Sequence, residues 1–194
     1  MSLHSEGELK MFDFNKIEEP IKIEPHKNYW KDWYVDETIL LRNIFEPNLI
    51  SFEHIGSTAV PDLDAKPIVD IAIGLRDFLI TDLQIQQLKE LGYEYFGQLH
   101  ITQERFFARK RKNRNFNLAI IPYNKKEWIE YIALRNYLRT HPDKVQQYSK
   151  IKNEAITLGK TSLLAYHSHK ETFVINLISD ALEWNNQCQS AGNR

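Results

Sequence analysis

A short polar turn, Gly56-Ser57-Thr58, follows an apolar segment and offers several groups that can bind a ligand. Glycine lets the backbone turn sharply and come close to a ligand. The hydroxyls of Ser57 and Thr58, and the backbone N–H groups beside them, are donors that a phosphate oxygen accepts. Lys66 adds a mobile cation on the same connection. Together, Gly56, Ser57, Thr58 and Lys66 predict a phosphate-binding turn.

A carboxylate follows this turn, within the most apolar segment of the chain. Asp70 lies in residues 67–75, which predict a central strand. An ionised carboxylate there is costly unless it is paired or holds a metal. Because side chains alternate along a strand, Asp70 falls on a small, polar face, and a later strand at 115–122 repeats this division with Asn117. Asp70 and Asn117 are therefore predicted to line an open face of the sheet that can host a ligand.

The residues beside the turn leave alternatives open. His54 could orient the loop or contact a phosphate, and a buried, hydrogen-bonded structural histidine fits the sequence equally well. Glu53, on the strand expected to neighbour Asp70, could serve with it as a second metal ligand. The turn could also be an ordinary one, with Asp70 a satisfied core carboxylate.

The secondary structure that holds these residues is predicted from hydrophobic periodicity and from breaks at Gly and Pro. The pattern predicts an α+β fold, with a mixed sheet that carries helices on one face, followed by a helical C-terminal third. The expected strands are 21–23, 49–55, 67–75, 104–109 and 115–122, and the expected helices are 28–45, 82–91, 126–139, 142–158 and 168–184. The expected parts are a partly disordered tail at 1–20, an α/β core at 21–125, packed C-terminal helices at 126–184 and a polar tail at 185–194.

Composition narrows the classes of partner. The formal net charge of −1 provides no global field for nucleic acid or for an anionic membrane, so a nucleic-acid partner is not expected. The basic segment 110–114 could hold phosphate or RNA, but a solvated hairpin tip is the favoured interpretation. The chain shows no apolar run of membrane-spanning length, no signal peptide and one cysteine, Cys188, which together predict a soluble cytoplasmic protein. The oligomeric state is left open.

Residues 53–61 (EHIGSTAVP) and 65–71 (AKPIVDI) together resemble the signature of the GrpB family. Residues 134–142 resemble the downstream helix of that family, and residues 166–174, with Lys170, resemble its C-terminal segment. The resemblance covers about residues 21–184. It implies a fold of the nucleotidyltransferase superfamily, which includes polymerase-β-like enzymes.

The resemblance also implies roles for the residues of the motif. Gly56 and Ser57 match the turn that binds nucleotide phosphates, and Asp70 matches the first of two carboxylates that hold Mg²⁺. Ala72 stands at the position of the second carboxylate, so the implied Mg²⁺ site is weak. The resemblance thus implies binding of a nucleotide or a phosphorylated small molecule, with Mg²⁺-dependent nucleotidyl transfer. The alternative is a degenerate binding module without turnover, and a third, a protein-interaction role, has only the amphipathic C-terminal helices in its favour.

Overall fold

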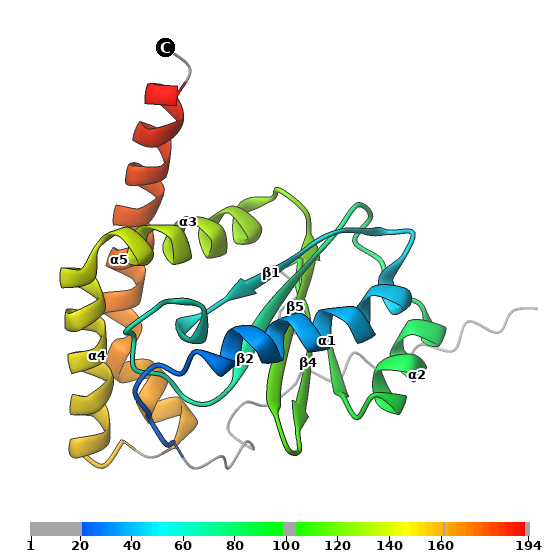
Figure 1. Cartoon of the computed structure of the whole chain (residues 1–194), viewed down its shortest axis with the longest axis horizontal. Coiled ribbons are helices and arrows are strands. Elements are labelled where there is room, and N and C mark those ends of the chain that lie inside the picture. The colour runs from blue at the N-terminus through cyan, green and yellow to red at the C-terminus, as the bar shows by residue number, and fades with distance from the viewer. Residues whose placement is uncertain (1–20, 99–103, 161, 193–194) are drawn as a thin grey trace, which may run out of the picture.

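The computed structural model describes residues 21–98, 104–160 and 162–192, and within them it places five strands and five α-helices (Figure 1). The strands are β1 (Leu49–Ile55), β2 (Val69–Leu75), β3 (Glu94–Gln98), β4 (Phe106–Arg111) and β5 (Asn115–Pro122). The helices are α1 (Tyr29–Phe45), the single 3₁₀ turn η2 (Ser57–Ala59), α2 (Asp82–Glu90), α3 (Lys126–Thr140), α4 (Pro142–Thr157) and α5 (Leu163–Gly192). The predicted α+β class with a helical C-terminal part is confirmed.

The strands form one mixed sheet in the order β1-β2-β5-β4-β3. β2 and β5 run parallel, and the other neighbouring pairs are antiparallel. In the parallel pair Asp70 lies opposite Asn117, so the two polar residues singled out in the sequence are neighbours on the same face.

The opposite face carries the main core. The alternate residues of β2 and β5 are fully buried there against α1 and α2, and they include Ile71, Ile73 and Leu118. Figure 1 shows α1 crossing this face. The helix ends at Phe45, where Glu46 turns to extended backbone before a proline that disfavours further helix.

Part of the polar face is covered as well. α3 packs Trp128 against Ala72 and Ala119, and a Cβ atom added at Gly74 would lie 2.6 Å from the Trp128 ring. α1 and α2 thus cover the core face of the sheet, as predicted, while α3 also covers one end of the polar face. α3, α4 and α5 pack on one another beside the sheet (Figure 1).

The observed elements differ from the predicted ones in several places. Strand β3 was not predicted; it is short and is interrupted by a register shift between Tyr95 and Gly97, so it lacks clean alternation. Residues 21–23 form no strand. The next residue, Glu24, forms an isolated antiparallel bridge with Ala65. α5 begins five residues earlier than expected because the Oγ of Ser162 accepts a hydrogen bond from the N–H of Ala165, as an N-cap does.

α5 also runs to Gly192, so most of the segment predicted as a polar tail is helical. The predicted tail at 1–20 lies outside the described residues. None of the described helices combines the length and the apolar character needed to cross a membrane.

Two residues of the basic segment 110–114 are more buried than predicted, whereas Lys112, Asn113 and Arg114 are exposed. Lys110 pairs with Glu37 of α1, and its side chain is 13% exposed. Arg111 donates to the backbone of Phe116 and to a side chain of the polar face. The prediction of a solvated tip is wrong for these two residues, because both extend along the sheet as part of β4.

Candidate functional site

The polar turn lies where β1 ends. Gly56 adopts φ 70° and ψ −171°, a conformation that favours glycine. A Cβ atom added at Gly56 would lie 2.3 Å from Oδ2 of Asp70, so the backbone of the turn passes directly beside the carboxylate. The structure therefore brings the turn and Asp70 together, and a glycine is needed between them.

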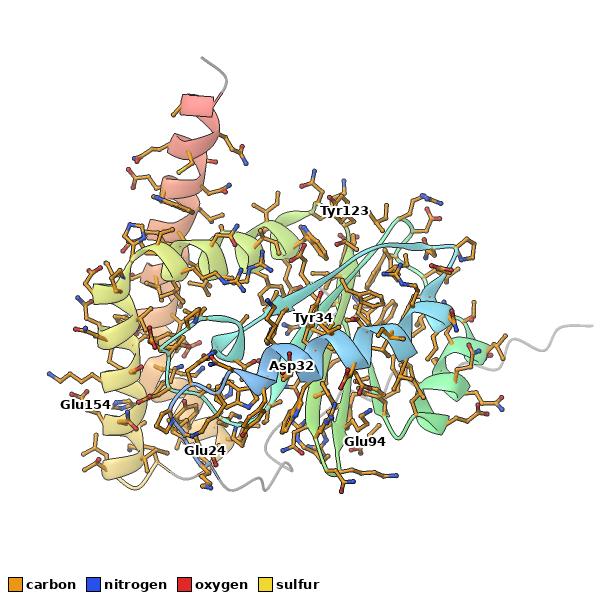
Figure 2. The ribbon with its side chains drawn as sticks, viewed as in Figure 1. Glu24, Asp32, Tyr34, Glu94, Tyr123 and Glu154 are labelled. Atoms are coloured by element: carbon orange, nitrogen blue, oxygen red, sulfur yellow. The ribbon has the colours of Figure 1, made fainter. Side chains whose placement is uncertain are left out.

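The histidine before the turn holds the loop from the core side of the sheet. His54 is 7% exposed, and its Nε2 shares a hydrogen bond of 3.0 Å with Oγ1 of Thr58. Its ring stacks on Tyr34 of α1, labelled in Figure 2, with 5.0 Å between the ring centroids. Burial, with the charges of Arg139 and Arg135, lowers the pKa of His54 to about 3. His54 is therefore neutral near neutral pH and orients the loop by binding the Thr58 hydroxyl.

Two arginines of α3 fix the same loop from the other side. Arg139 donates from Nε and Nη2 to the carbonyl oxygen of Ala59, at 3.0 and 2.8 Å. Arg135 donates to the carbonyl oxygen of His54 at 3.1 Å and forms an ion pair with Glu53. The loop is thus held at both ends, and the Glu53 carboxylate is engaged by α3.

A chain of hydrogen bonds crosses the polar face from β4 to β2. Arg111 Nη2 donates to Asn117 Oδ1 at 2.8 Å, and Asn117 Nδ2 donates to Asp70 Oδ1 at 2.7 Å. Burial raises the pKa of Asp70 above its ordinary value, while the bond from Asn117 and the charges of Lys66, Arg111 and Lys170 act in the opposite direction. The amide of Asn117 is therefore oriented at both ends and presents its N–H to the carboxylate.

A lysine from α4 completes the site. Lys152 is 2% exposed, and its Nζ donates to Ser57 Oγ at 2.7 Å and to the carbonyl oxygen of Asp64 at 2.6 Å. The Nζ also lies 4.0 Å from the centroid of the Tyr148 ring. Burial, together with the charge of Lys170, holds the pKa of Lys152 well below its ordinary value. All these partners are neutral groups.

These groups surround a small cavity of about 140 Å³ at the end of the sheet. Its polar lining includes Ser57, Lys66, Asp70, Lys152 and Lys170, with Thr58, Asn117 and Tyr166 beside them. Lys66 and Lys170 lie over the Tyr166 ring, 5.9 and 5.3 Å from its centroid. Three lysines thus face one carboxylate, and the balance of charge in the cavity is positive.

The donor set does not fit a Mg²⁺ ion held by the protein. Asp70 is the single carboxylate among the described residues that line the cavity, and one of its oxygens already accepts from Asn117. Glu53 is bound to Arg135, and Ala72 is fully buried in the cluster formed with Trp128. In the described ranges no three His, Cys, Asp or Glu side chains are grouped as a metal site requires.

Sequence reasoning found the turn, Lys66, Asp70 and Asn117, and it missed Lys152, Arg111 and the lining role of Lys170. A signal for Lys152 was present in the periodicity of α4. The buried residues of that helix are Val145, Tyr148, Lys152 and Ala155, so the lysine stands in an otherwise apolar stripe. Arg111 gave no such signal, because a basic residue beside a turn resembles any solvated tip.

Residues 20–180 match a family model described as GrpB protein. Among similar proteins, UPF0157 protein YqkA of Bacillus subtilis (strain 168) is 26% identical over 84% of this chain and 48% of its own, so the chain spans about half of that relative. Glutamate-rich protein GrpB of Alkalihalophilus pseudofirmus is 26% identical over 80% of this chain and 92% of its own.

A solved structure has the same fold. The crystal structure of the conserved protein GrpB from Enterococcus faecalis superposes with a TM-score of 0.78 at 28% sequence identity, covering 84% of this chain and 99% of that one. The names of these relatives state no activity, so any function has to be inferred from the site.

Proposed function

The chain belongs to the GrpB family, and from the geometry of its site we propose that it binds the phosphate group of a nucleotide or another phosphorylated small molecule of the cytoplasm, without turnover. The phosphate lies in the cavity of Ser57, Lys66, Lys152 and Lys170. A relation to the nucleotidyltransferases is part of this proposal and rests on the resemblance of the turn and of Asp70.

One observation supports the proposal most directly: Lys152 is buried, and among the described residues no carboxylate is bonded to its Nζ. A buried ammonium group is costly unless it is paired with an anion. In the described part of the chain, the groups bonded to Lys152 Nζ are a hydroxyl, a carbonyl oxygen and an aromatic ring. A phosphate in the adjoining cavity would supply a negative charge beside Lys152.

The other side chains of the cavity suit the same ligand. Ser57 supplies a hydroxyl that can donate to a phosphate oxygen while it accepts from Lys152. Lys66 and Lys170 add positive charge from two other elements. At about 140 Å³ the cavity is smaller than the roughly 300–1,000 Å³ of sites that enclose a drug-sized molecule. It therefore suits a phosphate group rather than a whole nucleotide.

The proposal excludes turnover because a second carboxylate is missing. Magnesium bound by protein in phosphoryl-transfer sites uses one or two carboxylates together with phosphate oxygens. Here Asp70 stands alone among lysines, and Ala72 lies beneath Trp128. In this arrangement lysines, and not a metal ion, neutralise the phosphate.

The test is a calorimetric titration with inorganic phosphate and pyrophosphate. We expect Lys152→Met to lower the affinity at least tenfold, since it removes the buried charge. Lys150→Met is the matched control, because Lys150 lies on the same helix, is 78% exposed and pairs with Glu154, which Figure 2 labels on the outer side of α4. Equal affinities for the wild type and Lys152→Met would contradict the proposal.

Nucleoside triphosphates with and without Mg²⁺ test the absence of turnover. We expect Mg²⁺ to change the affinity of the wild type for a nucleoside triphosphate by no more than about twofold. The affinity of Asp70→Ala should likewise be the same with and without Mg²⁺. A nucleotidyl product that depends on Mg²⁺ and is lost in Asp70→Ala would show that the protein is an enzyme and that Asp70 holds the metal.

A further inference from the structure

A second cavity, of about 220 Å³, adjoins the first. The two share Asp70 and Asn117 in their linings, and the turn passes between them, with Ser57 lining the first and Gly56 the second. Because Gly56 has no side chain, the turn places no side chain of its own between the cavities. The hydrogen-bonded pair of Asp70 and Asn117 lines both cavities.

The lining of the second cavity differs in kind. Its apolar lining comes from five residues on four strands and a helix, namely Ile55, Ile71, Phe107, Ala119 and Tyr131. Arg105 is the one cation among its described lining residues, compared with three lysines in the first cavity. One cavity is therefore suited to an anion and the other to an apolar group.

We propose that the two cavities are one binding site, and that its ligand is a phosphate ester whose organic part carries a flat, largely apolar ring. The inference rests on the proposed phosphate binding in the first cavity. The ring lies in the second cavity, and the bonds that join it to the phosphate pass beside Asp70 and Asn117, which line both cavities.

The walls favour a flat ring because their aromatic groups are fixed. Phe107 stacks on Phe96, with 5.6 Å between ring centroids and 27° between ring planes. The Tyr131 hydroxyl donates to Glu127 at 2.8 Å and accepts from Arg105 at 2.7 Å. Aromatic walls held in this way form a preorganised slot, which binds a rigid flat group at a lower entropic cost than a flexible chain.

Asp70 adds selectivity at the junction. Its carboxylate would repel a second phosphate group there but can accept a hydrogen bond from a hydroxyl on the connecting part of the ligand. A sugar hydroxyl in a nucleoside phosphate is such a group. Nucleoside phosphates and simple aryl phosphates both carry a ring and a phosphate group, and the following experiment distinguishes between them.

The experiment compares four ligands by calorimetry: inorganic phosphate, glycerol 3-phosphate, phenyl phosphate and a nucleoside monophosphate. We expect phenyl phosphate to bind the wild type at least tenfold more tightly than glycerol 3-phosphate. A nucleoside monophosphate that binds more tightly than phenyl phosphate would assign the ring to a nucleoside, and the reverse order would assign it to an aryl ester.

Phe107→Ala tests the position of the ring. We expect this variant to reduce the preference for phenyl phosphate to less than threefold while its affinity for inorganic phosphate is unchanged. Phe78→Ala is the matched control, because Phe78 is a partly buried phenylalanine that stacks on Phe106, on the core side of the same strand. It should keep the full preference.

The outcomes separate the two proposals. If inorganic phosphate binds and depends on Lys152 but the wild type shows no preference for a ring, the joined site is wrong and phosphate binding stands. If inorganic phosphate does not bind at all, the proposed function fails. Unchanged phosphate binding by Phe107→Ala also shows that the variant is folded.

Discussion

Two buried lysines mark the difference between the core side of the sheet and the cavity. Lys110 lies on the core face, where it pairs with Glu37, which also accepts a hydrogen bond of 2.9 Å from the Tyr93 hydroxyl. Lys152 lies at the cavity, where Ser57 and a backbone carbonyl accept from it. Both side chains are largely removed from water, but only the first has an acidic partner in the described chain.

The difference separates structural charges from charges available to a ligand. A lysine paired with a carboxylate stabilises the fold because each charge compensates the desolvation of the other. A lysine that has only neutral partners loses hydration without that compensation, and burial then lowers its pKa. We infer that the core side is complete by itself, whereas the cavity is completed by an anion.

The largest expected effect comes from breaking the pair on the core side. Lys110→Met should lower the free energy of unfolding by about 3–5 kcal/mol, because it leaves the Glu37 carboxylate buried without a counter-charge. Lys152→Met should leave stability unchanged or raise it, since it removes an uncompensated charge. Urea unfolding of both variants measures this contrast.

The control is the double variant Lys110→Met with Glu37→Leu, which removes both charges and should recover most of the loss. If Lys152→Met proved as destabilising as Lys110→Met, the distinction between the two lysines would be wrong. Lys152 would then be a structural residue.

The close approach of the turn to Asp70 should give the next largest effect. In Gly56→Ala the new methyl group would lie 2.3 Å from the Asp70 carboxylate in a backbone with φ 70°. We expect a loss of about 2–4 kcal/mol from the contact and the backbone together. Gly159 is the matched control, because its φ is 69° and no atom lies within 4 Å of its added Cβ.

Gly159→Ala should therefore cost about 1–2 kcal/mol, which is the backbone contribution alone. Combining Gly56→Ala with Asp70→Ala should recover the part due to the contact. Equal losses at the two glycines would mean that the turn is not pressed against Asp70.

The core side of the sheet and the cavity also differ in how well the sequence predicts their residues. Alternation along 67–75 and 115–122 correctly assigns which residues face the core, because hydrophobic period and strand period coincide. It also places Asp70 and Asn117 on one polar face, but it cannot show that Lys152, more than eighty residues later, reaches the turn. That contact depends on how α4 packs, which no local pattern encodes.

The contacts of Arg111 and Glu53 were missed for the same reason, because they also depend on tertiary packing. The role of Arg111 depends on the register of β4 against β5, which places its side chain on the polar face within reach of Asn117. The engagement of Glu53 depends on the position of α3 over β1. Residue types therefore identified several polar groups that the structure brings together, whereas the tertiary packing decided which other residues join them.

His54 allows a pH test of a buried group whose hydrogen-bond partner, Thr58, belongs to the fold itself. Its pKa is about 3 in the native protein, against an ordinary value of 6.5, so below pH 6.5 the unfolded chain binds a proton that the native chain does not. Stability should therefore fall as the pH drops, by about 1 kcal/mol between pH 6 and pH 5. Urea unfolding at each pH measures the slope.

His54→Gln is the comparison, because it removes the titrating group and keeps a side chain able to bond Thr58. It should be less stable than the wild type at pH 7, and its stability should change less with pH. An unaltered slope would mean that His54 is charged in the native protein.

Asp70→Asn should give the smallest effect, and its sign distinguishes the two kinds of buried charge. Burial raises the pKa of Asp70, so between its ordinary value of 3.8 and the raised value the native chain binds more protons than the unfolded one. Stability is lost as the pH rises through that window. Asparagine keeps an oxygen to accept from Asn117 and removes this cost, so the melting temperature should rise by about 2 °C above that window and by nothing below pH 3.8. A fall in the melting temperature at pH 7 would instead place Asp70 with Glu37, as a carboxylate that the fold requires.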